Sequence, residues 1–265
     1  MTGSPSATSH EVNSNQSLNQ WSLSLFLNII DSRHWNVLEY AMGNDPRAFQ
    51  IFARTIMHSS DLNGMTLLHA CVRFDPPTHI VKLLLDLVPE SPGRIDCLQR
   101  TPLHVAAGTR ASLPTIQLLA RAYPQACAIQ DEDGRTPLHL ACDSSCKLFE
   151  GDDREESASA SSKDVPSYEV VNTLMEASPS SAIPLLDHDD VSALKYAISS
   201  NAPIKVVRLL QHATRKECER NYAQQIQIQQ QHHQQQNATG LGMTRLTRRV
   251  SPNPQDFVQT MFPWM

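Results

Sequence analysis

Apolar residues recur along most of this chain at the spacing of short helices, and the arrangement returns four times. Each of four segments carries two apolar residues three positions apart, which places them on one face of a helix. These pairs are Val81/Leu84, Ile116/Leu119, Val171/Leu174 and Val207/Leu210. A run of small and apolar residues precedes each pair, and small side chains let neighbouring helices approach closely. The pattern predicts pairs of short helices that cannot bury their apolar faces alone and therefore stack on one another.

A four-residue phrase marks the start of the first helix in each pair. It reads Thr-Pro-Leu-His at residues 101–104 and again at 136–139, 35 positions later. A Thr-Leu-Leu-His version lies at 66–69, and a Ser-Ala-Leu-Lys version lies at 192–195. Threonine caps helix starts, and proline is favoured at the first helical position because its missing N–H would be unpaired there. Self-similarity at this period indicates a stacked array rather than a single globular core.

An aspartate opens each unit, at residues 61, 96, 131 and 187. The residues that follow are polar, and Asp, Asn and Gly tolerate tight-turn geometry, so each unit is predicted to begin with a turn. Gln99 and Asp190 stand where Gly64 and Gly134 stand in the other two units. Because glycine adopts turn conformations without steric cost, we expect the two tips without it to be strained or differently shaped.

The repeat resembles the ankyrin repeat family over roughly residues 60–215. The run Asp-x-Asp-Gly-Arg-Thr-Pro-Leu-His-Leu-Ala at Asp131–Ala141 is a near-complete match. The units here are longer than the family's usual length of about 33 residues. The resemblance implies an all-α solenoid with short turn fingers, in which the repeated histidine supports hydrogen bonds between neighbouring turns. The unit at Asp187–Ala213 departs most from the pattern and suits a C-terminal cap.

We predict that the array covers residues 20–217. Residues 34–58 are interpreted as a degenerate first unit, because a terminal repeat must cover an otherwise exposed core. Residues 21–30 are apolar enough to add a short helix against it. Together with the units that start at residues 61, 96, 131 and 187, this makes about five stacked helix pairs.

Three segments are expected to interrupt or extend the array. Residues 1–19 are polar and expected to be disordered. An acidic, Ser-rich insert at about residues 144–165 is also expected to be disordered. It is either a tolerated surface loop or a regulatory loop whose serines accept phosphate. Residues 218–265 form a C-terminal tail whose Gln-rich part, at 224–236, is low in complexity and prone to self-association.

The tail ends with a basic and then an apolar stretch. Arg248-Arg249-Val250-Ser251-Pro252 fits a kinase that prefers upstream arginines, although so short a pattern often matches by accident. Residues 257–264 are apolar, and three interpretations stay open: the segment docks on the array, it binds a partner, or it has no role.

Composition narrows the choice of function. The net charge of −5 argues against duplex nucleic acid as the main ligand, because such binding needs a large basic footprint. No apolar run reaches the roughly 18–20 residues that a membrane-spanning helix needs, so no membrane partner is expected. The six cysteines are scattered and fit reduced thiols. The N-terminus lacks the basic start of a secretory signal, and we expect a cytoplasmic or nuclear protein.

Histidines and cysteines near the repeated phrase are candidates for metal ligands or nucleophiles. His139, Cys142 and Cys146 offer three potential metal ligands within a short stretch. A structural zinc site needs four ligands in tetrahedral reach, and no fourth is evident nearby. The return of histidine at one position per unit favours a structural task over a metal ligand or a nucleophile. Glycine-rich phosphate loops and hydrolase motifs are absent from the sequence, so we predict no enzyme activity, no metal and no cofactor.

A solenoid of this kind offers an extended concave surface for binding. In the family this face combines the turn tips with the exposed side of the first helices. The corresponding tip residues here are Leu62, Asn63, Leu98, Glu132, Asp133, His188 and Asp189, and the helix residues are Arg73, Phe74, Thr109, Arg110 and Asp143. Phe74 and the two arginines are the strongest candidates, because aromatic and guanidinium groups dominate binding hot spots.

We therefore predict a protein–protein interaction module, a scaffold or adaptor, that binds its partner on the concave face. The tips become more acidic toward the C-terminal end, which predicts a basic segment on the partner. Reversing the charges of Glu132, Asp133 and Asp189 should then slow association and flatten its salt dependence. The alternative is a regulatory subunit in signalling or transcription that uses the Gln-rich tail. The oligomeric state stays open.

Overall fold

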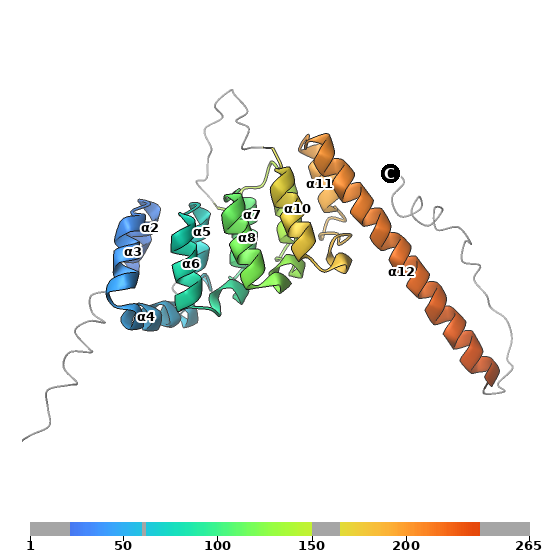
Figure 1. The fold of residues 1–265 in the computed structure, drawn as a ribbon, viewed down its shortest axis with the longest axis horizontal. Helices are drawn as coiled ribbons and strands as arrows, with labels where there is room; N and C mark the ends of the chain where they lie inside the picture. The colour runs from blue at the N-terminus through green and yellow to red at the C-terminus, as the bar shows by residue number, and fades with distance from the viewer. Residues whose placement is uncertain (1–21, 60–61, 150–164, 239–265) are drawn as a thin grey trace, which may run out of the picture.

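The computed structural model describes residues 22–59, 62–149 and 165–238, with side chains to residue 232. Within them the chain forms helices stacked side by side in a row, with no strand (Figure 1). The predicted all-α stacked architecture is confirmed. The expectations for residues 1–19, for Ser251 and for residues 257–264 lie outside the described part of the chain.

The helices of the array form two parallel rows. The inner row consists of α5 (Leu67–Arg73), α7 (Pro102–Gly108), α9 (Pro137–Cys142) and α11 (Ala193–Ser199), which contact one another in that order. The outer row consists of α6 (Thr78–Leu87), α8 (Leu113–Ala122), α10 (Tyr168–Ala177) and α12 (Ile204–Ala238). Short 3-10 turns follow the outer helices: η1 (Ser91–Gly93), η2 (Pro124–Ala128) and η3 (Ser180–Ala182).

The repeated phrase starts the inner helices as predicted. Thr66, Thr101 and Thr136 have extended backbones and cap the helices that follow. In each case the histidine three positions later accepts the backbone N–H of the capping threonine, so the two residues form a reciprocal capping box. Proline occupies the first position of α7 and α9, where no N–H is needed.

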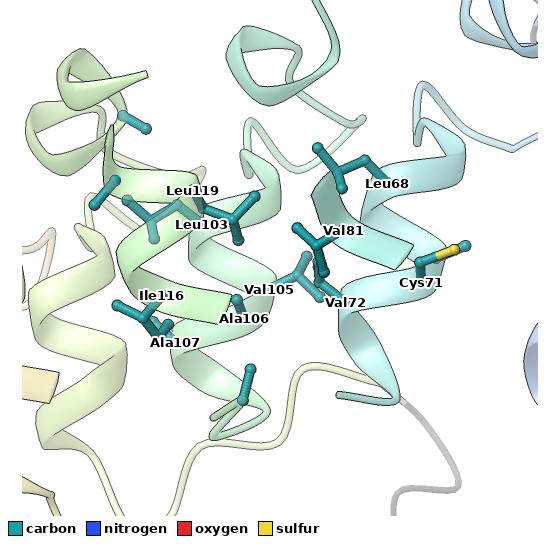
Figure 2. Close-up of a cluster of buried hydrophobic side chains, with 14 of the residues drawn as sticks. Leu68, Cys71, Val72, Val81, Leu103, Val105, Ala106, Ala107, Ile116 and Leu119 are labelled. Atoms are coloured by element: carbon teal, nitrogen blue, oxygen red, sulfur yellow. The ribbon is translucent and has the colours of Figure 1, made fainter. Parts of the chain in front are cut away.

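The core runs without interruption through the stack. Val81, Leu84, Ile116 and Leu119 of the outer helices are almost completely buried, as their spacing predicts. In Figure 2 the side chains of Val72 and Val81 lie next to Val105 of the following unit. Each helix pair therefore buries its apolar residues against neighbouring units as well as between its own two helices. In the last unit Val206, not the predicted Val207, joins Leu210 in the core, because these two are four positions apart on the face that meets α11.

The N-terminal end differs from the predicted arrangement. The pair that joins the two rows is α2 (Leu23–Asp31) with α3 (Trp35–Asn44), because α2 contacts α5 and α3 contacts α6. The segment predicted as the second helix of that unit is α4 (Pro46–His58), which follows α3 where later units have a 3-10 turn. Phe26 of α2 is fully buried and its ring lies 5.5 Å from that of Phe49 on α4, so the first helix belongs to the core. With this pair, the described residues hold five stacked helix pairs.

Two predicted boundaries do not coincide with the ends of elements. The tail was placed from residue 218, yet α12 continues through the Gln-rich tract to Ala238 and extends past the array (Figure 1). Glutamine is a good helix former, so the tract prolongs a helix that packing has already started. The insert was placed from residue 144, yet residues 144–149 are described and three of them pack on the core: Cys146, Leu148 and Phe149. The rest of the insert, residues 150–164, lies outside the described residues.

Candidate protein-binding face

The turns between units form fingers that are fixed by a repeated set of hydrogen bonds. In three of the fingers the opening aspartate accepts backbone N–H groups two and four positions later, at 2.8–3.1 Å. This arrangement holds for Asp96, Asp131 and Asp187. Such side-chain turns fix the backbone without a strand ladder. The fingers have the local geometry that the sequence predicted.

Neighbouring fingers are joined by backbone hydrogen bonds. Cys97 N–H donates to the carbonyl of Asn63 at 2.8 Å, Glu132 N–H to that of Leu98 at 3.0 Å, and His188 N–H to that of Asp133 at 2.9 Å. These bonds link four consecutive tips into one continuous edge. A partner therefore meets a surface whose spacing is already fixed, which lowers the entropic cost of binding.

Buried histidines tie each inner helix to the next finger. The Nδ1 atom of His69 accepts from Thr66 N–H, so Nε2 carries the hydrogen and donates to the carbonyl of Arg100 at 3.0 Å. His104 and His139 repeat this pattern and reach the carbonyls of Ile129 and Leu185. Burial lowers the pKa of His69 and of His104 from 6.5 to about 4, and it lowers that of His139 as well. All three rings are neutral near pH 7 and act as uncharged bridges between units.

The two fingers without glycine have the same turn as the Gly134 finger, with a hydrogen bond from the residue at this position to the carbonyl of the opening aspartate. Gln99 has φ of 58° and Asp190 has φ of 57°, whereas Gly64 and Gly134 have 80° and 78°. Gln99 and Asp190 both lie in the left-handed region, where a side chain costs about 1–2 kcal/mol. The two tips therefore carry the expected backbone strain. The alternative expectation, a different shape, is wrong relative to the Gly134 finger. The first finger is the one that differs, because Asn63 and Gly64 both have positive φ and Met65 N–H donates to the carbonyl of Leu62.

We call the surface formed by the finger tips and the inner helices the inner face. Six of the predicted binding residues lie exposed on its tips: Asn63, Leu98, Glu132, Asp133, His188 and Asp189. Leu62 is a correction, because its side chain is buried in the core rather than presented to a partner. The equivalent residues of later units, Glu132 and His188, are exposed, so the inward position is specific to the first finger.

The predicted helix residues lie at the C-terminal ends of the inner helices. Arg73, Phe74, Thr109 and Arg110 are half-buried there. Arg110 donates from Nη2 to the carbonyl of Asp143 at 3.0 Å and so links the ends of α7 and α9. Asp143 is the second correction: it is buried, and its carboxylate accepts from the backbone and hydroxyl of Ser145. The Asp143 side chain thus stabilises a turn, a role that short carboxylate side chains commonly have.

Residues 144–149 cross the inner face, which the sequence interpretation missed. Leu148 and Phe149 are half-buried, and the carbonyl of Leu148 accepts from Nη1 of Arg100 at 3.0 Å. Gly108 makes room for Leu148, because a Cβ at that glycine would lie 2.4 Å from Leu148 Cδ1. The available signal was the adjacent pair of large apolar residues at the start of a segment otherwise rich in serine and acidic residues.

Arginines and phenylalanines alternate across this part of the face. The Arg33 guanidinium lies 5.7 Å from the Phe74 ring, and Arg73 lies 5.3 Å from the same ring. Arg73 also lies 4.1 Å from the ring of Phe149, and Arg100 lies 5.0 Å from that ring on the other unit. These distances fall within the range of cation–π attraction. We call these five residues the Arg–Phe ladder. Of these five, the sequence predicts only Arg73 and Phe74 as site residues, and it misses Arg33, Arg100 and Phe149.

A hollow of about 210 Å³ lies beside the ladder at the base of two fingers. Its walls include Leu98, Arg100, Glu132, Arg135 and Leu148. Arg100 is held by Asp96 at 2.7 Å in a buried ion pair, whereas Arg135 lies 3.3 Å from Asp131 and is more exposed. Burial raises the pKa of Asp131 above its usual value, and Arg135 opposes this. The hollow therefore has charged walls of both signs and suits polar side chains of a protein partner.

Comparison with known protein families identifies the repeated unit. A family model of ankyrin repeats, in three copies, matches residues 68–150. This segment consists of ankyrin repeats. No curated protein sequence matches the chain. Ankyrin repeats act as protein–protein interaction modules. The helix pairs on either side of the matched segment stack in the same two rows. Among the helices of the described residues, none has the length and apolar composition needed to cross a bilayer.

Within the ankyrin repeats, the histidines and cysteines serve the fold. Both ring nitrogens of His139 are engaged, one with Thr136 and the other with the carbonyl of Leu185. Burial raises the pKa of Cys142 to about 12 and that of Cys146 to about 11, so both are protonated thiols near pH 7. The described residues contain no group of three His, Cys, Asp or Glu side chains placed to hold a metal ion.

Proposed function

We propose that this chain is a scaffold or adaptor that binds a protein partner along the inner face of its ankyrin array. The observation that carries the proposal is the edge of exposed finger tips, which hydrogen bonds between fingers hold at fixed spacing. The acidic tip residues Glu132, Asp133 and Asp189 are exposed on this edge. They support a partner with a basic segment, because opposite charge steers association and fixes its register.

The geometry refines the charge-reversal test. Asp133 already has a partner, since Arg135 Nη2 lies 2.5 Å from its carboxylate. Reversing Asp133 would place two positive charges together and disturb the finger itself. Glu132 and Asp189 are the better targets, because both side chains are exposed and neither forms an ion pair among those the structure shows. The variant Glu132→Lys/Asp189→Lys therefore changes the surface with the least effect on the fold.

The experiment starts with proximity labelling by the full-length chain, which identifies partners. Each partner is then captured with the wild type and with Glu132→Lys/Asp189→Lys. The matched control is Asp86→Lys/Glu176→Lys, which makes the same change in net charge at exposed positions of the outer helices α6 and α10. We expect the inner-face variant to capture less partner than the wild type, and its remaining capture to depend less on salt concentration. The control should match the wild type in both measurements. Equal capture by both variants would rule out the acidic tips as the binding surface.

A second candidate function is supported by α12. This helix carries the Gln-rich tract beyond the array, where it is accessible to a second protein (Figure 1). In this alternative the chain is a regulatory subunit in signalling or transcription. Ending the chain after Ala223 removes the tract but keeps Leu210 and Cys218, which are buried. If proximity labelling identifies nuclear partners and the truncated chain loses these partners but keeps the others, the alternative is favoured.

The proposed location is the cytosol or the nucleus. All six cysteines lie within the described residues and are free thiols. Proteins of oxidising compartments more often pair their cysteines, which supports a reducing environment. Fractionation of cells that express the tagged full-length chain tests this directly, and recovery in the secretory pathway would contradict it.

A further inference from the structure

Residues 144–149 connect units that are far apart along the chain. They begin at the end of α9, in the third ankyrin unit, and reach back to the second and first units. Leu148 contacts Gly108 at the end of α7 and accepts a hydrogen bond from Arg100. Phe149 reaches Arg73 at the end of α5. The segment therefore lies across the same inner-helix ends that the proposed function assigns to a partner.

Phe149 occupies a position that favours an aromatic ring. Arg73 and Arg100 lie 4.1 Å and 5.0 Å from its centroid. An aromatic ring attracts cations through its negative face, and an aliphatic side chain of similar size does not. Without the ring both guanidinium groups would lose this cation–π attraction, and Arg100 would keep only its ion pair with Asp96 and its hydrogen bond to Leu148. The position thus selects phenylalanine, tyrosine or tryptophan over leucine.

The segment rests on the array rather than forming part of its core. Ser144, Ser145 and Lys147 are exposed, and Phe149 is only half-buried. By contrast, Val105 and Leu103 of α7 are almost fully buried. Displacing residues 144–149 would remove Phe149 from between Arg73 and Arg100 without removing any of the fully buried core side chains.

From this geometry we propose that the position between Arg73 and Arg100 is a binding site for an aromatic side chain of the partner, which Phe149 occupies while the chain is unbound. The inference rests on the proposed function and names a feature of the partner: a peptide segment with an exposed aromatic residue. Binding of the partner displaces Phe149, so the apparent affinity equals the affinity of the empty site multiplied by the fraction of time that Phe149 leaves the site free.

The test supplies the segment in trans. The probe is a fluorescein-labelled peptide with the sequence of residues 144–149, and binding is measured by fluorescence anisotropy. The receptor is the full-length chain, either wild type or with Leu148→Ser/Phe149→Ser, which empties the site. A third receptor adds Arg73→Ala to the double substitution. A control peptide carries leucine in place of the phenylalanine.

We expect the peptide to bind the emptied receptor about tenfold or more tightly than the wild type, because the wild type already holds its own segment. Loss of the aromatic ring should weaken binding about five- to tenfold, and Arg73→Ala should weaken it similarly. Equal binding to wild type and emptied receptor, or equal binding of the two peptides, would overturn the proposal.

Folding of the emptied receptor is checked by circular dichroism and thermal unfolding. If it is unfolded, Phe149→Ala replaces it, with Tyr40→Ala as the matched removal of an exposed aromatic elsewhere. Failure of Phe149→Ala to fold, while Tyr40→Ala folds, would show that the segment is core and would also overturn the proposal. These results are independent of the Glu132→Lys/Asp189→Lys experiment, so failure of the aromatic site leaves the binding function of the tips to be judged separately.

Discussion

Acidification should destabilise the array through its buried histidines. His69 and His104 are neutral bridges between units, and burial lowers the pKa of each from 6.5 to about 4. In the unfolded chain both rings take up protons as the pH falls below about 6.5. The folded state resists protonation until about pH 4. The unfolded state therefore binds more protons between these values, and stability falls as the pH is lowered through this window.

The size of the effect follows from the two pKa values. At about pH 5 each histidine should cost about 2 kcal/mol of unfolding free energy, relative to about pH 7.5. The two together cost about 4 kcal/mol, and His139 adds to the loss because its pKa is lowered too. This is a large fraction of the roughly 5–15 kcal/mol that stabilises a typical protein.

Urea unfolding followed by circular dichroism measures this loss at a series of pH values. The matched variant is His104→Gln, which is less stable at neutral pH but no longer titrates at this position. Its loss of stability between about pH 7.5 and pH 5 should be smaller than that of the wild type by about 2 kcal/mol. A wild-type stability that stays constant over this range would refute the assignment of neutral, buried imidazoles.

Three further predictions concern the fingers, the inner-face segment and the thiols. Gln99→Gly should stabilise the fold by about 0.5–1 kcal/mol by removing left-handed strain, whereas Gly134→Ala should destabilise it by about 2 kcal/mol or more; urea unfolding distinguishes them. Gly108→Ala should lower the melting temperature, because its Cβ would meet Leu148, and adding Leu148→Ala should restore most of the loss; an unrescued double variant would contradict this contact. Alkylation of the native chain, followed by mass spectrometry, should modify the exposed Cys97 before any buried cysteine; earlier labelling of another thiol would show that the array opens.

The repeat itself could be predicted from the sequence because its signals are local. A capping threonine, a proline at the first helical position and a histidine three residues after the threonine fix the start of an inner helix within one turn. The apolar pairs of α6, α8 and α10 follow from helical periodicity alone, whereas in α12 it gave Val207 in place of Val206. The histidine bridges followed from the family resemblance, since their acceptors lie in the next unit, about 30 residues away.

The features that sequence reasoning missed depend on contacts between distant segments. Leu62 is buried in the core, whereas the polar residues Glu132 and His188 at the same position of later units are exposed. The N-terminal pair was misplaced because its packing partners, α5 and α6, begin dozens of residues later. Phe149 lies in a segment with the composition of a disordered insert, yet two arginines from other units hold it. Local composition does not encode such long-range contacts.

Site-specific photo-crosslinking in the full-length chain tests most directly whether the partner binds the inner face. A photoreactive amino acid replaces Leu98 on the finger edge or, as the comparison, Ile204 at the start of the outer helix α12; both side chains are exposed. Our account predicts that the partner is crosslinked from position 98 and not from position 204. Crosslinking from position 204 alone would contradict it.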